Sequence, residues 1–119
     1  RQRQMCIRDR LRSNKEPCCD LATVQKLVAQ GKYRSSKRVR GDIRNHGYDY
    51  EETVEDVISS IEPHHYYKTD ELEHIPGTFA DIYRHIECYD EEWYVKFFFD
   101  KDDNELVIIW SLKPDGYAF

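Results

Sequence analysis

The spacing of apolar residues changes near Pro63, and this change limits the folds open to the chain. Between residues 21 and 61, apolar residues recur every three or four positions, which is the spacing of one helix face. After residue 63 they alternate with polar residues, as in strands that bury one face. The pattern predicts an α+β domain, with three N-terminal helices packed on a mainly antiparallel sheet.

Residues with strong local preferences mark the ends of the expected helices. Asp20 is a good N-cap for a helix over residues 21–30, which Gly31 would end. A second, strongly basic helix is expected from Ser35 or Ser36 to about His46, and a third from Tyr50 to Ile61, with Asp49 and Glu52 as a capping pair. A short extended piece at residues 32–34 separates the first two helices.

Four strands are expected in the second half: Tyr66–Lys68, Phe79–Cys88, Trp93–Phe99 and Leu106–Leu112. If Phe99 faces Leu106, Tyr94 lies opposite Ser111, and one face of the last hairpin gathers Trp93, Val95, Phe97, Phe99, Leu106, Ile108, Trp110 and Leu112. Burial of each is worth about 1.5 to 3 kcal/mol, so we expect this register. The other face then carries Tyr94, Lys96, Ser111 and Lys113.

The 119 residues suffice for one domain. Residues 1–10 look like a translated sequencing adapter, with a natural basic tail as the alternative. Without their four arginines and one aspartate, the net charge of -5 becomes about -8. We expect a flexible segment at 11–19 and a single domain at 20–119.

No apolar stretch approaches 18 residues and no secretory leader is visible, so we expect a cytoplasmic protein without a membrane span.

The cysteines predict reduced thiols rather than a metal site. Cys6 belongs to the suspect segment, which leaves Cys18, Cys19 and Cys88 at no recognised ligand spacing. A zinc site that combines them with histidines is the alternative, but adjacent cysteines rarely supply two ligands of one tetrahedral site. We therefore expect no metal and no cofactor.

Tyrosine, lysine and arginine recur on the expected strands, and these side chains suit phosphate chemistry. Metal-free RNA cleavage needs a group that takes the proton of a ribose 2'-hydroxyl, cations for the phosphorus oxyanions and an acid for the leaving oxygen. The same residues are also compatible with an ordinary half-buried sheet and a solvated outer face. The pattern alone therefore leaves both interpretations open.

Several runs together resemble the MqsR family of toxin–antitoxin toxins: Val24 to Gly31, Tyr67-Lys68, Asp81-Ile82-Tyr83-Arg84, Trp93-Tyr94-Val95-Lys96 and Ser111-Leu112-Lys113. The resemblance covers about residues 20–113 and rests on their order and spacing. It implies a RelE-like fold and a metal-independent endoribonuclease (mRNA interferase). It also implies an mRNA substrate, and an antitoxin partner that binds zinc and has a helix-turn-helix domain.

The resemblance also assigns the site. It implies that Lys68 and Lys113 stabilise the phosphorane or assist proton transfer, that Tyr94 acts in acid–base chemistry and that Arg84 holds phosphate. Ala80 stands where the family usually has glutamine, so a polar active-site contact is absent. An inactive, antitoxin-binding module and a toxin that acts only on the ribosome are the alternatives.

Further RNA contacts are expected from the aromatic and basic residues around these positions. They are Tyr67, Tyr83, Lys96, Lys37 and Arg38. The last two lie in the basic second helix, whose cluster is equally compatible with a solvated face or an antitoxin-docking surface. We expect His64 and His65 to form a polar loop rather than supply a catalytic base.

Overall fold

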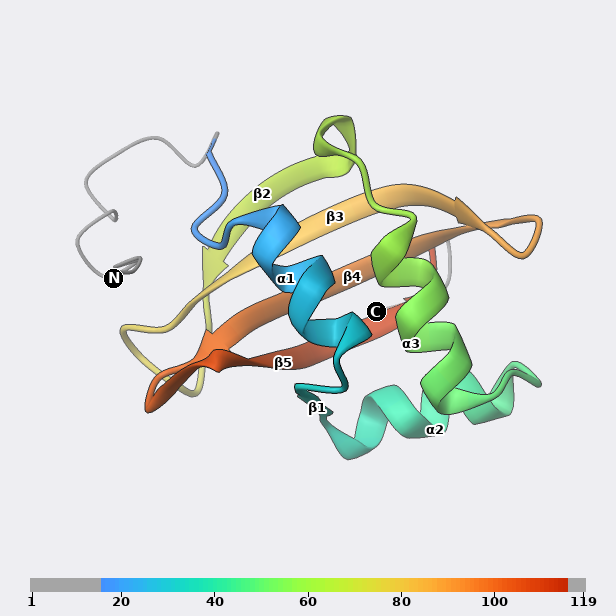
Figure 1. Ribbon diagram of the computed structural model, residues 1–119, viewed down its shortest axis with the longest axis horizontal. Helices are drawn as coiled ribbons and strands as arrows, with labels where there is room; N and C mark the ends of the chain where they lie inside the picture. The colour runs from blue at the N-terminus through green and yellow to red at the C-terminus, as the bar shows by residue number, and fades with distance from the viewer. Residues whose placement is uncertain (1–15, 116–119) are drawn as a thin grey trace.

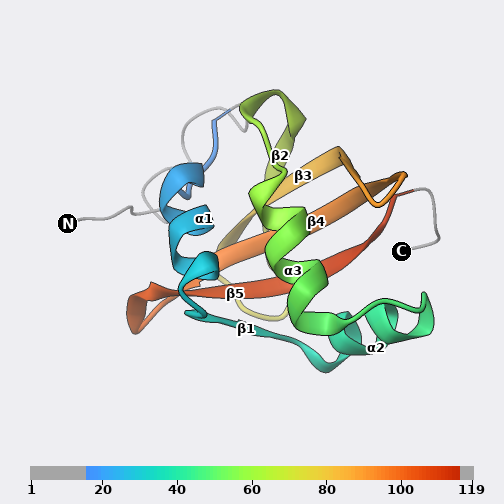
Figure 2. The ribbon, with the colours of Figure 1, turned by 45° about the vertical axis from the view of Figure 1, so that its right-hand side comes forward.

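The computed structural model describes residues 16–115 and contains three helices and a five-stranded sheet (Figures 1 and 2). The elements follow in the order α1 (Leu21–Ala29), β1 (Tyr33–Ser35), α2 (Lys37–Asn45), α3 (Tyr50–Ser59), the 3-10 turn η2 (Pro63–His65), β2 (Tyr66–Glu71), β3 (Phe79–Cys88), β4 (Glu91–Asp100) and β5 (Asp103–Pro114). The strand order is β1-β5-β4-β3-β2, and only β1 runs parallel to its neighbour. The α+β prediction is confirmed.

Local capping chemistry positions the helices as the sequence predicts. The side chains of Asp20, Ser36 and Asp49 each accept a backbone N–H in the first turn of α1, α2 and α3. Gly31 and Gly47 follow α1 and α2 with φ of 79° and 86°, a conformation that other residues rarely adopt. The extended piece before α2 is strand β1, which pairs with β5 over three residues.

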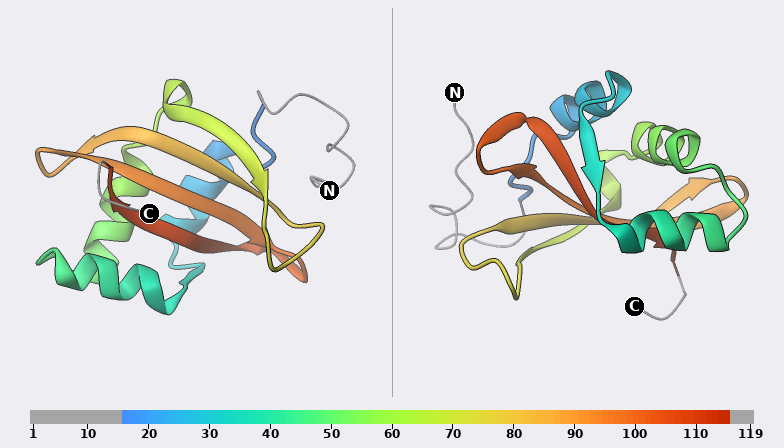
Figure 3. Two further views of the ribbon diagram at one scale, coloured as in Figure 1. Left: turned by 180° about the vertical axis from the view of Figure 1, so that it is seen from behind. Right: turned by 90° about the horizontal axis from the view of Figure 1, so that it is seen from below.

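The main core lies between the sheet and α1 and α3. Trp93, Val95 and Phe97 of β4 are fully buried there, against the apolar stripes of both helices. The right panel of Figure 3 shows these two helices on one side of the sheet, and the left panel shows the opposite side, where the strands lie in front. We call this opposite side the outer face. It positions the candidate site.

The predicted register of the last hairpin is wrong. Tyr94 pairs with Lys113 rather than Ser111, and Phe99 pairs with Val107 rather than Leu106. Between the pairs Lys96–Ser111 and Phe97–Ile109 one extra residue, Trp110, forms a bulge. The bulge returns the strand to the predicted alternation at its end, so that Lys113 still lies on the same face as Tyr94.

The register differs because the outer face has an apolar cluster of its own. Ile108 and Trp110 leave the main core and pack with Phe98 and Ala80 beneath Leu72, which belongs to the β2–β3 connection. The prediction assumed that eight large apolar residues of the hairpin, Ile108 and Trp110 among them, share one buried face. Because Leu72 covers part of the outer face, Ile108 and Trp110 can be buried there instead of in the main core.

The segment before α1 is hydrogen-bonded to the sheet through Asp81 of β3. The backbone N–H groups of Cys18 and Cys19 donate to the two carboxylate oxygens of Asp81, at 2.9 and 2.7 Å. Thr69 donates to the same carboxylate from β2. These two cysteines therefore belong to the folded body rather than to a loose leading segment; the expectations for residues 1–10 and 11–15 lie outside the described residues.

Candidate functional site on the outer face

The four residues expected at the site lie on the outer face, one on each of four adjacent strands: Lys68 on β2, Arg84 on β3, Tyr94 on β4 and Lys113 on β5. Tyr94 and Lys113 are direct cross-strand partners. Arg84 lies level with Tyr94, because the residues beside them, Tyr83 and Val95, are paired. Sheet pairing thus brings three of the four into one row.

Tyr67 connects the two cations nearest the free edge of the sheet. It lies at a register irregularity between Tyr66 and Lys68, and its side chain is 53% exposed. The Lys68 ammonium is 5.4 Å from the centre of its ring, and the Arg84 guanidinium is 5.2 Å from it. Cation–π contacts of this kind hold a positive charge over an aromatic face. Tyr67 therefore gathers Lys68 and Arg84 around one ring.

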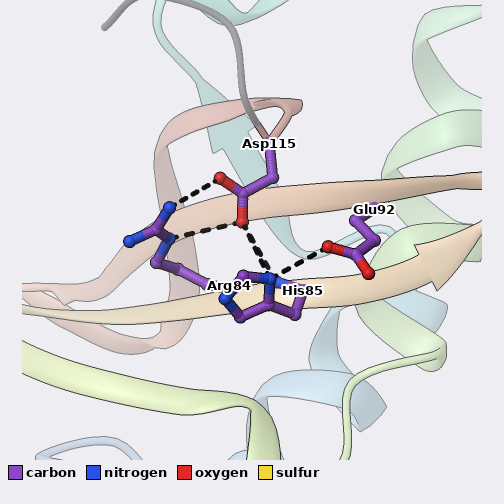
Figure 4. Close-up of polar contacts among 4 residues, drawn as sticks. All are labelled: Arg84, His85, Glu92 and Asp115. Atoms are coloured by element: carbon purple, nitrogen blue, oxygen red, sulfur yellow. Dashed lines mark hydrogen bonds and ion pairs between the residues drawn. The ribbon is translucent and has the colours of Figure 1, made fainter.

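Arg84 is oriented by Asp115, the residue directly after β5 (Figure 4). Its Nη2 and Nε donate to the two carboxylate oxygens at 2.9 and 3.3 Å, and the backbone N–H of His85 donates to the second oxygen at 3.2 Å. Burial alone would raise the pKa of Asp115, but these hydrogen bonds outweigh it and hold the pKa below its usual value. The guanidinium has five N–H donors, and the contacts with Asp115 use two of them.

Lys68 also has an acidic neighbour. Its Nζ lies 3.2 Å from a carboxylate oxygen of Asp70, and both side chains are about two-fifths exposed. Water screens such a pair, so its net contribution to stability is small. A phosphate can therefore compete for Lys68 at little cost.

The environment of Tyr94 keeps its phenol protonated, which suits a general acid. Partial burial raises the pKa of its phenol, the charge of Asp70 raises it further and Arg84 opposes them. At neutral pH Tyr94 therefore keeps its proton and can donate it.

Lys113 differs from the other cations because it is only 8% exposed. Burial lowers the pKa of its ammonium, the nearby Arg38 of α2 lowers it further and Asp42 opposes the shift. A lowered pKa makes the neutral, proton-accepting form of a lysine more accessible than it is for a fully exposed lysine.

Of the remaining residues expected to contact RNA, three lie at the surface and Tyr83 lies in the main core. Lys96 lies on the outer face opposite Ser111, and Lys37 and Arg38 are exposed on α2 beside β5. Tyr83 is only 1% exposed and stacks on Phe97 in the main core at 5.5 Å between ring centres. The expectation that Tyr83 contacts RNA is therefore corrected, because Tyr83 faces the helices.

Ala80 is fully buried in the apolar cluster of the outer face, between Leu72 and Phe98. Its cross-strand partner on β2 is Asp70, which also pairs with Lys68. The position where the resemblance implies a glutamine is thus next to the cationic residues but is packed with apolar side chains.

Sequence reasoning missed Asp115 and the irregular backbone at His85, whose φ is +63°. Asp115 is remote from Arg84 in sequence, and nothing in the local pattern marks it as a partner. Within residues 16–115, no three or more His, Cys, Asp or Glu side chains gather in an arrangement that could hold a metal ion. The zinc alternative for the cysteines has no support there, and the absence of a metal or cofactor stays a prediction.

The fold and the surface together define a small α+β domain whose outer sheet face carries lysine, arginine and tyrosine. The family described as motility quorum-sensing regulator, toxin of MqsA (MqsR toxin) matches residues 16–113, and the chain belongs to this family. Membership implies a toxin of a toxin–antitoxin system with an antitoxin partner. A comparison with curated proteins found no match. Within the described part of the chain, no helix has the length and apolar character needed to cross a membrane.

Proposed function

We propose that this chain is a metal-independent endoribonuclease, an mRNA interferase toxin that acts in the cytoplasm. The observation that carries the proposal is the gathering of Lys68 and Arg84 around Tyr67, on the same outer face of the sheet as the Tyr94–Lys113 pair. Two cations beside a neutral phenol match the needs of phosphodiester cleavage. The mRNA substrate and a zinc-binding antitoxin with a helix-turn-helix domain belong to the same proposal.

The proposed chemistry is an internal transfer of the phosphoryl group. A base removes the proton of the ribose 2'-hydroxyl, the 2'-oxygen bonds to phosphorus and the bond from phosphorus to the 5'-oxygen breaks. Tyr94 gives its proton to that leaving oxygen, and Lys113, with its lowered pKa, is suited to take the first proton. Arg84 and Lys68 stabilise the charged phosphorane. The products are a 2',3'-cyclic phosphate and a 5'-hydroxyl end.

The test is cleavage of a defined single-stranded RNA in excess EDTA, with product ends identified by mass spectrometry. We expect cyclic phosphate ends from the wild type and at least a hundredfold slower cleavage by Lys68→Ala, Arg84→Ala and Tyr94→Phe. Lys26→Ala, an exposed change on α1 at the opposite face, is the matched control and should cleave normally. A wild type that leaves RNA intact, or site variants as active as the control, would refute the proposal.

A toxin-like module that binds antitoxin with little or no cleavage is the second candidate. It is favoured by Ala80, which offers no polar group, and by the carboxylates already paired with Lys68 and Arg84. Tight antitoxin binding by a protein that shows no turnover in the same EDTA assay would identify it.

A further inference from the structure

A groove of about 670 Å³ opens beside the candidate site, at the edge of the sheet formed by β2 and β3. Arg84 and Tyr67 belong to its lining, so it is continuous with the proposed phosphate-binding residues. Its far wall comes from η2, which contributes His64 and His65. The volume is within the range of small-ligand sites. None of the steps proposed above uses this groove beyond its shared residues.

The η2 wall offers an aromatic surface and a hydrogen-bond donor. The rings of His64 and His65 lie 4.2 Å apart between centres, inclined by 45°. Burial lowers the pKa of His65, and the neighbouring His64 lowers it further, so its ring is neutral at pH 7. Because its Nδ1 accepts the backbone N–H of Glu62, the neutral ring carries its hydrogen on Nε2.

The opposite wall supplies acceptors and is acidic. Glu87 and Glu92 are cross-strand partners on β3 and β4 and both line the groove. His85 lies with its Nδ1 2.9 Å from a carboxylate oxygen of Glu92 (Figure 4). Carboxylates repel phosphate but accept hydrogen bonds from amino groups of bases. The groove therefore suits a nucleobase, whereas Arg84 in its lining suits the phosphate.

We propose that this groove binds the base of the nucleotide next to the scissile phosphate, and that it prefers a base with an exocyclic amino group over uracil. The inference rests on the proposed ribonuclease function. Proteins read unpaired RNA bases by stacking them on aromatic side chains and hydrogen-bonding their edges. The histidine pair supplies the stacking surface, and Glu87 and Glu92 accept the amino hydrogens. The groove is thereby a determinant of sequence preference.

The test measures binding separately from cleavage. Fluorescein-labelled 2'-fluoro hexamers, which lack the attacking hydroxyl, are titrated with protein and followed by anisotropy, one of alternating cytosine and adenine and one of uracil alone. The double variant His64→Ala/His65→Asn removes the ring pair, while the asparagine oxygen still accepts the Glu62 N–H. His74→Ala, at an 85% exposed side chain outside the groove, is the control.

We expect the wild type and the control to bind the cytosine–adenine hexamer several-fold more tightly than the uracil hexamer. The double variant should bind the cytosine–adenine hexamer about tenfold more weakly, the loss of one stacked base, and should lose the preference. Equal affinity of the wild type for both hexamers, or a double variant that binds as the control does, overturns the inference.

The two proposals fail in distinguishable ways. A groove that discriminates between the hexamers in a protein that cleaves no natural RNA would refute the ribonuclease function alone. Cleavage that depends on Lys68, by a protein whose hexamer affinities are unchanged by the histidine substitutions, would refute the groove alone.

Discussion

Replacing Asp115 by asparagine tests how much the ion pair with Arg84 contributes. The substitution keeps the shape of the side chain and one acceptor oxygen, but removes the negative charge. Asp115 is only 5% exposed, and it accepts two hydrogen bonds from Arg84 and one from the backbone of His85. The change therefore acts on a nearly buried charge with well-defined partners.

The expected loss follows from these contacts. A hydrogen bond to a charged group is worth about 1.5 to 3 kcal/mol, and partial exposure of Arg84 reduces the effect of the lost charge. Since asparagine retains one acceptor, we expect the free energy of unfolding to fall by about 1 to 2 kcal/mol. For a domain of this size that lowers the melting temperature by about 4 °C or more.

The pH dependence separates charge from packing. The pKa of Asp115 is lower in the folded state than in the unfolded chain, so its contribution is present above the unfolded pKa and is lost as pH falls through the folded pKa. The difference between wild type and variant should be full at pH 7 and shrink below about pH 4.

Urea unfolding at several pH values measures this difference, with Asp102→Asn in the exposed β4–β5 turn as the matched control. Equal stability of wild type and Asp115→Asn at pH 7, or a difference that persists unchanged at pH 3, would refute the reasoning.

Three further substitutions test other parts of the account. Tyr94→Phe should slow single-turnover RNA cleavage by at least a hundredfold while it changes the melting temperature little; a normal rate would exclude Tyr94 as the acid. Asp81→Ala should lower the free energy of unfolding, measured by urea titration, by about 3 kcal/mol or more, because it leaves two backbone N–H groups and a hydroxyl without their acceptor. A loss below about 1 kcal/mol would contradict the role given to Asp81 in holding residues 18 and 19 on the sheet. Ala80→Gln should destabilise by about 1 to 3 kcal/mol, because it forces a larger polar side chain into a fully buried position packed against Leu72 and Phe98, and cleavage should not accelerate. A stable, faster variant would show that a missing amide limits the reaction.

The helices were predictable because their signals are local. Asp20, Ser36 and Asp49 cap the first turns with their own side chains, so the neighbouring sequence contains what is needed. The hairpin register was not predictable in the same way. It depends on Leu72, which covers the outer face from a remote connection and allows Trp110 to leave the main core.

The candidate site was also predictable only in part. The strand runs and the family resemblance were enough to propose Lys68, Arg84, Tyr94 and Lys113, and the sheet places all four on one face. The error at Tyr83 arose because a half-polar tyrosine suits either face of a strand. Asp115 became visible only in three dimensions.

The most direct test of the central claim maps where RNA binds on the sheet. Uniformly ¹⁵N-labelled protein is titrated with the uncleavable cytosine–adenine hexamer, and backbone amide shifts are followed by NMR. The account predicts that the largest shifts fall on Lys68, Arg84, Tyr94 and their neighbours on the outer face, while α1 is unchanged. Shifts concentrated on α1, with the outer face unaffected, would contradict it.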